Sequence, residues 1–208
     1  MSTQGSPEWL AERVGRVTAS RVADVVAKTK SGYGASRANY LAELIAERLT
    51  GQAAERYTNG AMQWGTENEP EAREAYEFLT GNSVNQVGFI PHPTIQMSGA
   101  SPDGMVGEDG LIEIKCPNTS THIETLLGRA VPSKYVAQMT WQLACTRRKY
   151  CDFVSYDPRM PPDMRFFCSR MELDHEYAIE LETEVKKFLS ELDARLAELT
   201  ALFRKEAA

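Results

Sequence analysis

Two short strand-forming segments joined by a tight turn lie near the middle of this chain, and they limit its possible folds more than any other feature. Residues 103–106 and 111–115 are β-branched or alternate between apolar and polar types. The Gly-Glu-Asp-Gly sequence between them is typical of a hairpin turn. We therefore predict an antiparallel strand pair at this point, within a larger series of short strands.

The pattern around this hairpin predicts an α/β chain with the order helices, strands, helix, strands, helix. Ser36 is a candidate N-cap for the first long helix, and Gly51 and Gly81 follow the ends of the first two. Pro70 lies inside the second and has to open a turn or kink it. The predicted helices are 36–49, 63–79, 133–146 and a long closing helix with an apolar stripe from Leu181 to Phe203; the other predicted strands are 84–90, 95–98, 150–156 and 165–172.

Composition narrows the class of protein. The 208 residues are 42% hydrophobic, enough for one packed domain over residues 1–208. No apolar run approaches the roughly 20 residues of a membrane span, and the N-terminus does not resemble a secretory signal, so we expect a cytoplasmic protein. Four cysteines without CxxC spacing indicate reduced thiols. The net charge of −6 argues against indiscriminate nucleic-acid binding but permits a local basic groove.

The second strand of the hairpin carries the residues with the clearest chemical potential. Alternation sends Glu113 and Lys115 to one face, about 7 Å apart along the strand, and Ile112 and Ile114 to the other. Asp103, on the partner strand, can reach the face of Glu113. Two carboxylates beside an ammonium suit Mg²⁺ and phosphodiester hydrolysis. The alternative for Glu113 and Lys115 is an ordinary salt pair on a strand.

Several motifs in matching order, from Trp9 to about Arg165, resemble the lambda exonuclease (YqaJ viral recombinase) family of the PD-(D/E)xK nuclease superfamily. Pro102-Asp103 followed by Glu113-x-Lys115 resembles the signature of that nuclease superfamily. The resemblance implies a restriction-endonuclease-like core, in which a central mixed sheet is flanked by helices. The further motifs are Trp64-Gly65, Ser101-Pro-Asp-Gly104, Gly110-Leu111, Lys115-Cys-Pro117, Tyr135 with Gln138, and Tyr156-Asp-Pro-Arg-Met160.

The resemblance also implies a catalytic centre. Asp103, Glu113 and the backbone carbonyl of Ile114 would bind Mg²⁺, two ions in all, with Mn²⁺ as a possible substitute. Lys115 would position or activate the attacking water. Glu69 matches an additional acidic residue near the second metal; its alternative is a surface pair with Arg73, and Glu67 is its local competitor.

The implied substrate contacts lie elsewhere along the chain. A pocket for a terminal 5′-phosphate maps onto Arg13, Ser20, Ser101 and Gln138, and an Arg with hydroxyl and amide donors is a sound phosphate receiver. Tyr135, Gln138 and Gln142 share one helix face, either as a polar lining or as hydrogen-bond donors to the sheet. Other implied DNA contacts are Lys30, in the groove, and Met62, as an apolar wedge between strands, although a buried core position is the alternative for Met62.

From the resemblance we expect a Mg²⁺-dependent 5′→3′ exonuclease that degrades one strand of double-stranded DNA to mononucleotides and leaves 3′ overhangs. The implied partners are DNA ends, a single-strand annealing protein and two further copies in a trimeric ring, in a bacterial cell and of phage or prophage origin. Pro70, Gly60 and Thr121 depart from the family pattern. The alternatives are a structure-specific or restriction-type endonuclease, or a non-catalytic DNA-end-binding protein.

Overall fold

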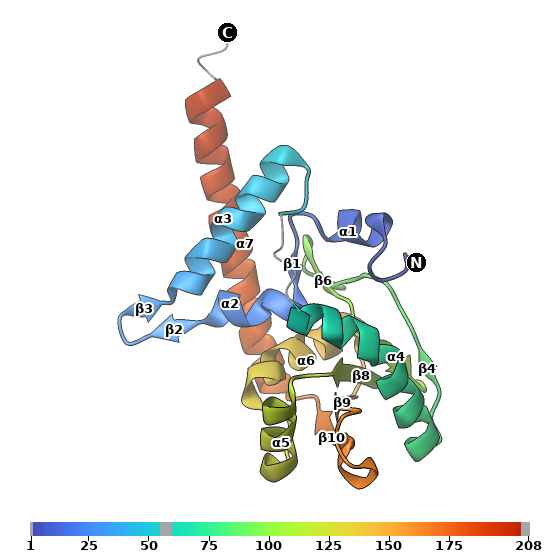
Figure 1. Cartoon of the computed structure of the whole chain (residues 1–208). Helices are drawn as coiled ribbons and strands as arrows, with labels where there is room; N and C mark the ends of the chain where they lie inside the picture. The colour runs from blue at the N-terminus through green and yellow to red at the C-terminus, as the bar shows by residue number, and fades with distance from the viewer. Residues whose placement is uncertain (1, 55–59, 205–208) are drawn as a thin grey trace.

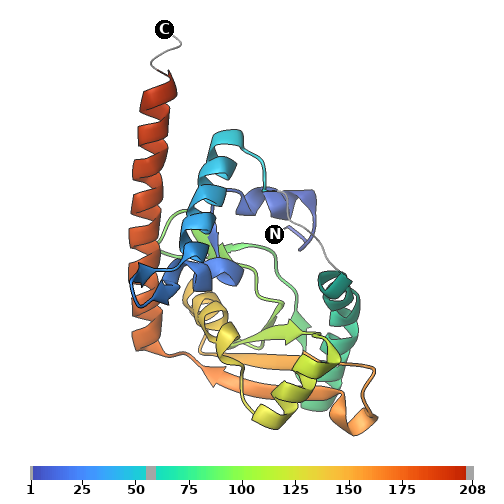
Figure 2. The same cartoon turned by 60° about the vertical axis from the view of Figure 1, so that its left-hand side comes forward.

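The N-terminal part of the chain is a series of short helices and strands followed by two long helices. The structure, a computed structural model, describes residues 2–54 and 60–204. Figures 1 and 2 show these first elements beside and above the main sheet. They are α1 (Pro7–Arg13), β1 (Val17–Thr18), η1 (Ala19–Arg21), α2 (Val22–Val26), β2 (Lys28–Thr29), β3 (Gly32–Tyr33), α3 (Ala35–Thr50) and α4 (Gly60–Thr80).

The main sheet is mixed and has the strand order β10-β9-β8-β7-β4. Strands β8 and β9 pair in parallel, with Glu113 opposite Phe153, and the other pairs are antiparallel. Because β8 is central, neighbouring strands hold it on both sides, and its side chains are nearly all buried. The members are β4 (Val84–Asn85), β7 (Gly104–Val106), β8 (Gly110–Lys115), β9 (Tyr150–Tyr156) and β10 (Phe166–Glu172).

A smaller sheet has the order β1-β6-β5, with β5 at Ile90–Pro91 and β6 at Ser98–Ala100. Strand β1 pairs with β6 in parallel, so the N-terminal segment lies against the residues that lead to Asp103. Behind this sheet, apolar side chains of α2, α3, α6 (Ser133–Thr146) and α7 (His175–Arg204) form one core cluster. The N-terminal region is thereby tied to the strand that enters the predicted site.

Helices cover both faces of the main sheet. Ala72 and Tyr76 of α4 pack on Ile112 and Ile114 on one face. On the other face, Met139 and Leu143 of α6 pack on the side of Leu111 and Phe153. Helix α5 (Thr119–Gly128) also lies on this second face, where His122 hydrogen-bonds Ser155 of β9. The arrangement confirms the predicted mixed sheet flanked by helices.

Helix α7 is the longest element, and its C-terminal half extends away from the rest of the molecule (Figures 1 and 2). The first half of its predicted apolar stripe is buried, whereas Leu199 is 37% exposed and Phe203 is 70% exposed. The stripe thus continues beyond the core that it helps to form. No helix within residues 2–54 and 60–204 is both long and apolar enough to cross a membrane.

Several predicted elements are confirmed. Helix 133–146 and strand 150–156 have the predicted bounds, and 36–49, 63–79, 103–106, 111–115 and 165–172 differ by at most a few residues. Gly51 and Gly81, each with a positive φ, follow α3 and α4 as predicted. Helix α4 continues through Pro70, so the proline does not open it.

Other predictions were wrong. Ser36 is not an N-cap, because α3 begins at Ala35 and Gly34 occupies the capping position. The predicted strand 84–90 is two separate strands, β4 and β5, which belong to different sheets. Strand 95–98 is shifted to Ser98–Ala100, and helix α5 was not predicted. The apolar pattern of residues 84–90 does not show that β4 and β5 belong to different sheets, because it carries no information about the strands with which they pair, β7 and β6.

Candidate active site

The predicted acidic pair lies where β7 and β8 begin to separate. Gly104 pairs with Ile112, so Asp103, one residue earlier, stands beside Glu113 of the neighbouring strand. The side chain of Asp103 turns across the gap, and its Oδ2 accepts a hydrogen bond of 2.6 Å from the backbone N–H of Ile114. This bond fixes the orientation of one carboxylate next to the other.

The side chain of Glu113 is only 1% exposed, and polar side chains contact both of its carboxylate oxygens. Its Oε1 forms an ion pair with Nζ of Lys115 and accepts a hydrogen bond of 2.5 Å from Nε2 of Gln138. Its Oε2 accepts a hydrogen bond of 2.6 Å from Nε2 of Gln142. Glu113 and Lys115 therefore share a face, as alternation predicts, and that face looks toward α6.

The electrostatics of this cluster reflect two carboxylates close together. Burial raises the pKa of Asp103 well above its ordinary value, and the nearby charge of Glu113 raises it further. Burial lowers the pKa of Lys115, but the charges of Glu113 and Asp103 outweigh this effect and raise its pKa overall. Lys115 therefore stays positively charged, and Asp103 has a strong tendency to take up positive charge.

Asp103 and Lys115 open onto a cleft of about 370 Å³ between β8 and the first half of α4. Glu69 also lines this cleft, with its side chain 32% exposed, and it forms an ion pair of 2.5 Å with Arg73. Glu69 therefore faces the cleft and also forms the ion pair with Arg73 that was the alternative to a metal-binding role.

The donor set fits a hard divalent cation. Asp103, Glu113 and the carbonyl of Ile114 offer oxygen atoms, the ligands that Mg²⁺ prefers. Within the part of the chain that the structure describes, no three His, Cys, Asp or Glu side chains gather closely enough to hold an ion by themselves. An ion here would therefore need carbonyl or water ligands besides the two carboxylates, and Glu69 does not join them as a third.

The residues predicted to receive a phosphate are only partly brought together. Nη1 of Arg13 donates to the hydroxyl of Ser101 at 3.2 Å, close to Asp103 in the chain. Ser20 is exposed and lies 3.4 Å from the hydroxyl of Thr18. The amide of Gln138 donates to Glu113. Of the two alternatives for this helix face, Gln138 thus shows hydrogen bonding to the sheet.

Trp9 is a further residue of this area that our reading of the sequence did not single out. Its indole N–H donates to the Ser101 hydroxyl at 2.9 Å, and the Arg13 guanidinium lies 4.2 Å from its ring centroid. The signal available in the sequence was the spacing of Trp9 and Arg13, which places them on one face of α1. Their shared contact with Ser101 depends on the tertiary structure.

The predicted DNA contacts lie at accessible positions. Lys30 is exposed at the turn of the β2–β3 hairpin, which projects from the molecule (Figure 1). Met62 is 50% exposed and lines the cleft, so it is not a buried core residue. Tyr135 also lines the cleft and stacks on Phe153, with Nζ of Lys115 5.4 Å from its ring centroid.

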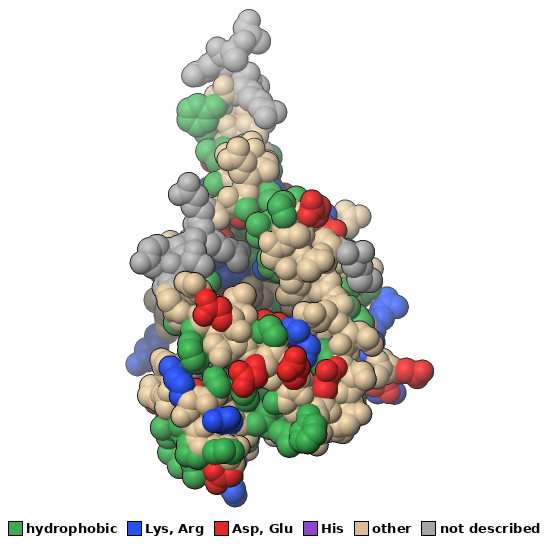
Figure 3. All heavy atoms as spheres, turned by 45° about the vertical axis from the view of Figure 1, so that its right-hand side comes forward, with side chains coloured by type: hydrophobic (Ala, Val, Ile, Leu, Met, Phe, Trp, Pro, Cys, Tyr) green, Lys and Arg blue, Asp and Glu red, His purple; other side chains and the backbone are tan. Residues whose placement is uncertain are grey.

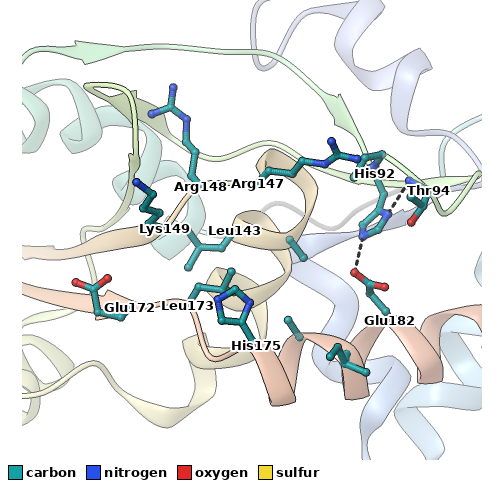
Figure 4. Close-up of a pocket in the computed structure, with 14 residues that line it drawn as sticks. His92, Thr94, Leu143, Arg147, Arg148, Lys149, Glu172, Leu173, His175 and Glu182 are labelled. Atoms are coloured by element: carbon teal, nitrogen blue, oxygen red, sulfur yellow. Dashed lines mark hydrogen bonds and ion pairs between the residues drawn. The ribbon is translucent and has the colours of Figure 1, made fainter.

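A second cavity of about 660 Å³ lies between the C-terminal end of α6 and helix α7 (Figure 4). His92 lines it, with Nδ1 accepting the backbone N–H groups of Thr94 and Ile95 and Nε2 facing Glu182 at 3.6 Å. Because Nδ1 is the acceptor, the proton of the neutral ring lies on Nε2. The Nε2–H of His92 therefore points toward Glu182 without reaching hydrogen-bond distance, and a protonated nitrogen is not available to bind a metal.

The mixed sheet, with an acid at the start of β7 and an acid-x-lysine sequence on β8, defines the PD-(D/E)xK class of nuclease folds. Within that class, residues 8–149 match the YqaJ-like viral recombinase domain. This match covers more than half of the chain, and the chain belongs to that family.

Solved structures and one bacterial protein are similar to this chain. The alkaline exonuclease LHK-Exo from Laribacter hongkongensis is 55% identical, with a TM-score of 0.89 over 97% of this chain and 98% of that one. A phage related exonuclease from Haemophilus somnus 129PT, 15% identical, shares the fold with a TM-score of 0.71 over 88% and 96% of the two chains. The protein ExoD of Escherichia coli (strain K12) is 29% identical over 77 residues, 37% of this chain and 87% of that protein.

Proposed function

We propose that this protein is a DNA exonuclease which, with Mg²⁺, degrades one strand of double-stranded DNA from 5′-phosphorylated ends to mononucleotides and leaves 3′ overhangs for strand annealing. The family and the similarity to LHK-Exo support exonuclease activity. LHK-Exo has also been crystallised with dAMP, a mononucleotide of the kind that such a reaction releases.

The observation that carries the proposal is the cluster of Asp103, Glu113 and Lys115, of which Asp103 and Lys115 line the cleft and Glu113 is buried beside them. Asp103 and Glu113 carry like charges close together, Lys115 pairs with Glu113 and offsets only part of that repulsion, and the carboxylate oxygen atoms fit Mg²⁺. When bound, the metal would make a water molecule more acidic and offset charge on the phosphate. Lys115, fully charged, would orient that water and favour negative charge that develops at the phosphorus.

The preference for a 5′-phosphate rests on the neighbouring cluster of Arg13 and Ser101. A guanidinium and a hydroxyl together provide several donors to phosphate oxygens. Trp9 holds both groups by stacking and by a hydrogen bond, so the pair is positioned before DNA arrives. Ser20 and Gln138 complete the proposed pocket, and Lys30, Met62 and Tyr135 form the proposed DNA contacts.

We further propose one nuclease domain over residues 1–208, assembled as a trimeric ring around DNA, with a single-strand annealing protein as partner in a bacterial cytoplasm. A ring reconciles DNA binding with a net charge of −6, because only its channel has to be basic. On the face drawn in Figure 3, acidic and basic side chains are interspersed rather than gathered into one basic field.

The test is a plasmid incubated with Mg²⁺ in circular and linear forms. We expect the linear form to be degraded, with 5′-label released as mononucleotide, while the closed circle remains intact. The variant Lys115→Ala should lose about 10²–10³-fold in rate, because a charged group in a preorganised site is removed, and should still bind duplex. Cutting of the circle would instead support a restriction-type endonuclease, and unchanged hydrolysis by the variant would exclude the role given to Lys115.

A further inference from the structure

The amide of Gln142 occupies a place in the core where an apolar side chain would be expected. Gln142 is 0% exposed, on the face of α6 that packs on the sheet, and its neighbours Met139 and Leu143 belong to an apolar cluster. Its Nε2 donates to Glu113, but its Oε1 has no hydrogen-bond partner among the described residues. A buried acceptor without a partner costs about 1–3 kcal/mol.

The hydrogen bonds of Glu113 indicate what offsets this cost. A carboxylate has about four acceptor positions. Lys115 and Gln138 use Oε1 twice, and Gln142 uses Oε2 once. One acceptor position on Oε2 is left, and the hydrogen bond from Gln142, the only one to Oε2 among the described residues, helps to fix the rotation of the carboxylate and therefore the direction in which that position points.

We propose that Gln142 is a positioning residue for the metal site: it holds Glu113 in the orientation that binds a divalent cation, at the expense of folding stability. The inference rests on the proposed function, since it requires an ion at Asp103 and Glu113. Gln142 does not itself contact the ion or the DNA. Groups that orient metal ligands in this way commonly change metal affinity by about 10–100-fold when removed.

The test uses Gln142→Met, which keeps the length of the side chain and removes the donor. Binding of Mn²⁺ to the full chain without DNA is followed by the electron paramagnetic resonance signal of the free ion, and melting temperature is measured without metal. We expect Mn²⁺ affinity to fall about 10-fold or more. The melting temperature without metal should stay close to that of the parent, because the loss of the unsatisfied Oε1 of Gln142 offsets the loss of one hydrogen bond to Glu113.

Met139→Leu is the matched control, since Met139 lies on the same helix and in the adjacent apolar cluster and its side chain has no donor for Glu113, and the variant should keep the Mn²⁺ affinity of the parent. Unchanged Mn²⁺ affinity in Gln142→Met would overturn the inference and leave the proposed function standing. Equal affinity in the parent and in Asp103→Asn, or no Mn²⁺ binding by the parent, would overturn the proposed function itself. Loss of folding in both Gln142→Met and Gln142→Leu would show that Gln142 is needed for stability, and would also overturn the inference.

Discussion

A buried polar side chain in a folded protein usually has a hydrogen-bonding or charged partner. His92 is an example outside the proposed catalytic site. Its Nδ1 accepts two backbone N–H groups, its ring stacks on Trp141, and Nε2 faces Glu182 of α7. Burial lowers its pKa, Glu182 opposes that effect, and the charges of Lys186 and Arg147 add to it.

The lowered pKa of His92 predicts a loss of stability in mild acid. The folded protein binds a proton at His92 less readily than the unfolded chain, whose His pKa is about 6.5. The stabilisation is therefore present above pH about 6.5 and is lost as the pH falls through the folded pKa, with a slope of at most about 1.4 kcal/mol per pH unit.

Denaturant unfolding from pH 7.5 to 5 measures this effect. In His92→Asn the side-chain oxygen can still accept a backbone N–H but does not titrate, so its stability should fall less steeply with decreasing pH. The variant will be less stable at neutral pH because it loses the ring stacking, so the slopes are the quantity to compare. Parallel slopes would show that His92 does not cause the acid dependence.

At the scale of the elements, α4 contains a residue that is unfavourable in the interior of a helix. It is a helix of 21 residues with Pro70 in its interior. A proline there lacks the N–H that would bond the carbonyl four residues earlier, and its ring crowds that turn. The helix survives because Ala72 and Tyr76 are completely buried against the sheet, so packing outweighs the local preference.

Replacement of Pro70 should therefore stabilise the protein. We expect Pro70→Ala to raise the free energy of unfolding by roughly 2–3 kcal/mol, measured in urea, because the missing hydrogen bond is restored. Glu74→Ala, at an exposed position of the same helix, is the control and should change it by no more than about 0.5 kcal/mol. A gain no larger than that of the control would mean that the helix accommodates Pro70 without cost.

At the scale of the whole molecule, an acidic chain must gather its DNA contacts in a limited region. If DNA is enclosed, several phosphates are neutralised at once, and each contributes a slope of about −0.9 to the dependence of log affinity on log salt. We expect a slope of −4 or steeper for duplex binding by Lys115→Ala, measured from about 50 to 200 mM salt. A slope near −1 would indicate contact with a single phosphate and would contradict an enclosing channel.

Much of this architecture follows from local sequence. Helix 133–146 and strand 150–156 were predicted with their bounds, since periodicity and turn residues mark both ends clearly. The shared face of Glu113 and Lys115 follows from alternation alone. The division of residues 84–90 between two sheets did not follow, because the pairing partners lie in β7 and β6, and no local pattern encodes a distant partner.

The sequence by itself determined which side chains are available and the direction in which each leaves its own strand or helix, and its motifs determined the family. Only the tertiary structure decided which groups meet. The crossing of α6 over the sheet brings Gln138 and Gln142 to Glu113, and the start of β7 brings Asp103 to the N–H of Ile114. The physical reason is that backbone geometry sets orientation over a few residues, whereas contacts between distant segments depend on the packing of the whole core.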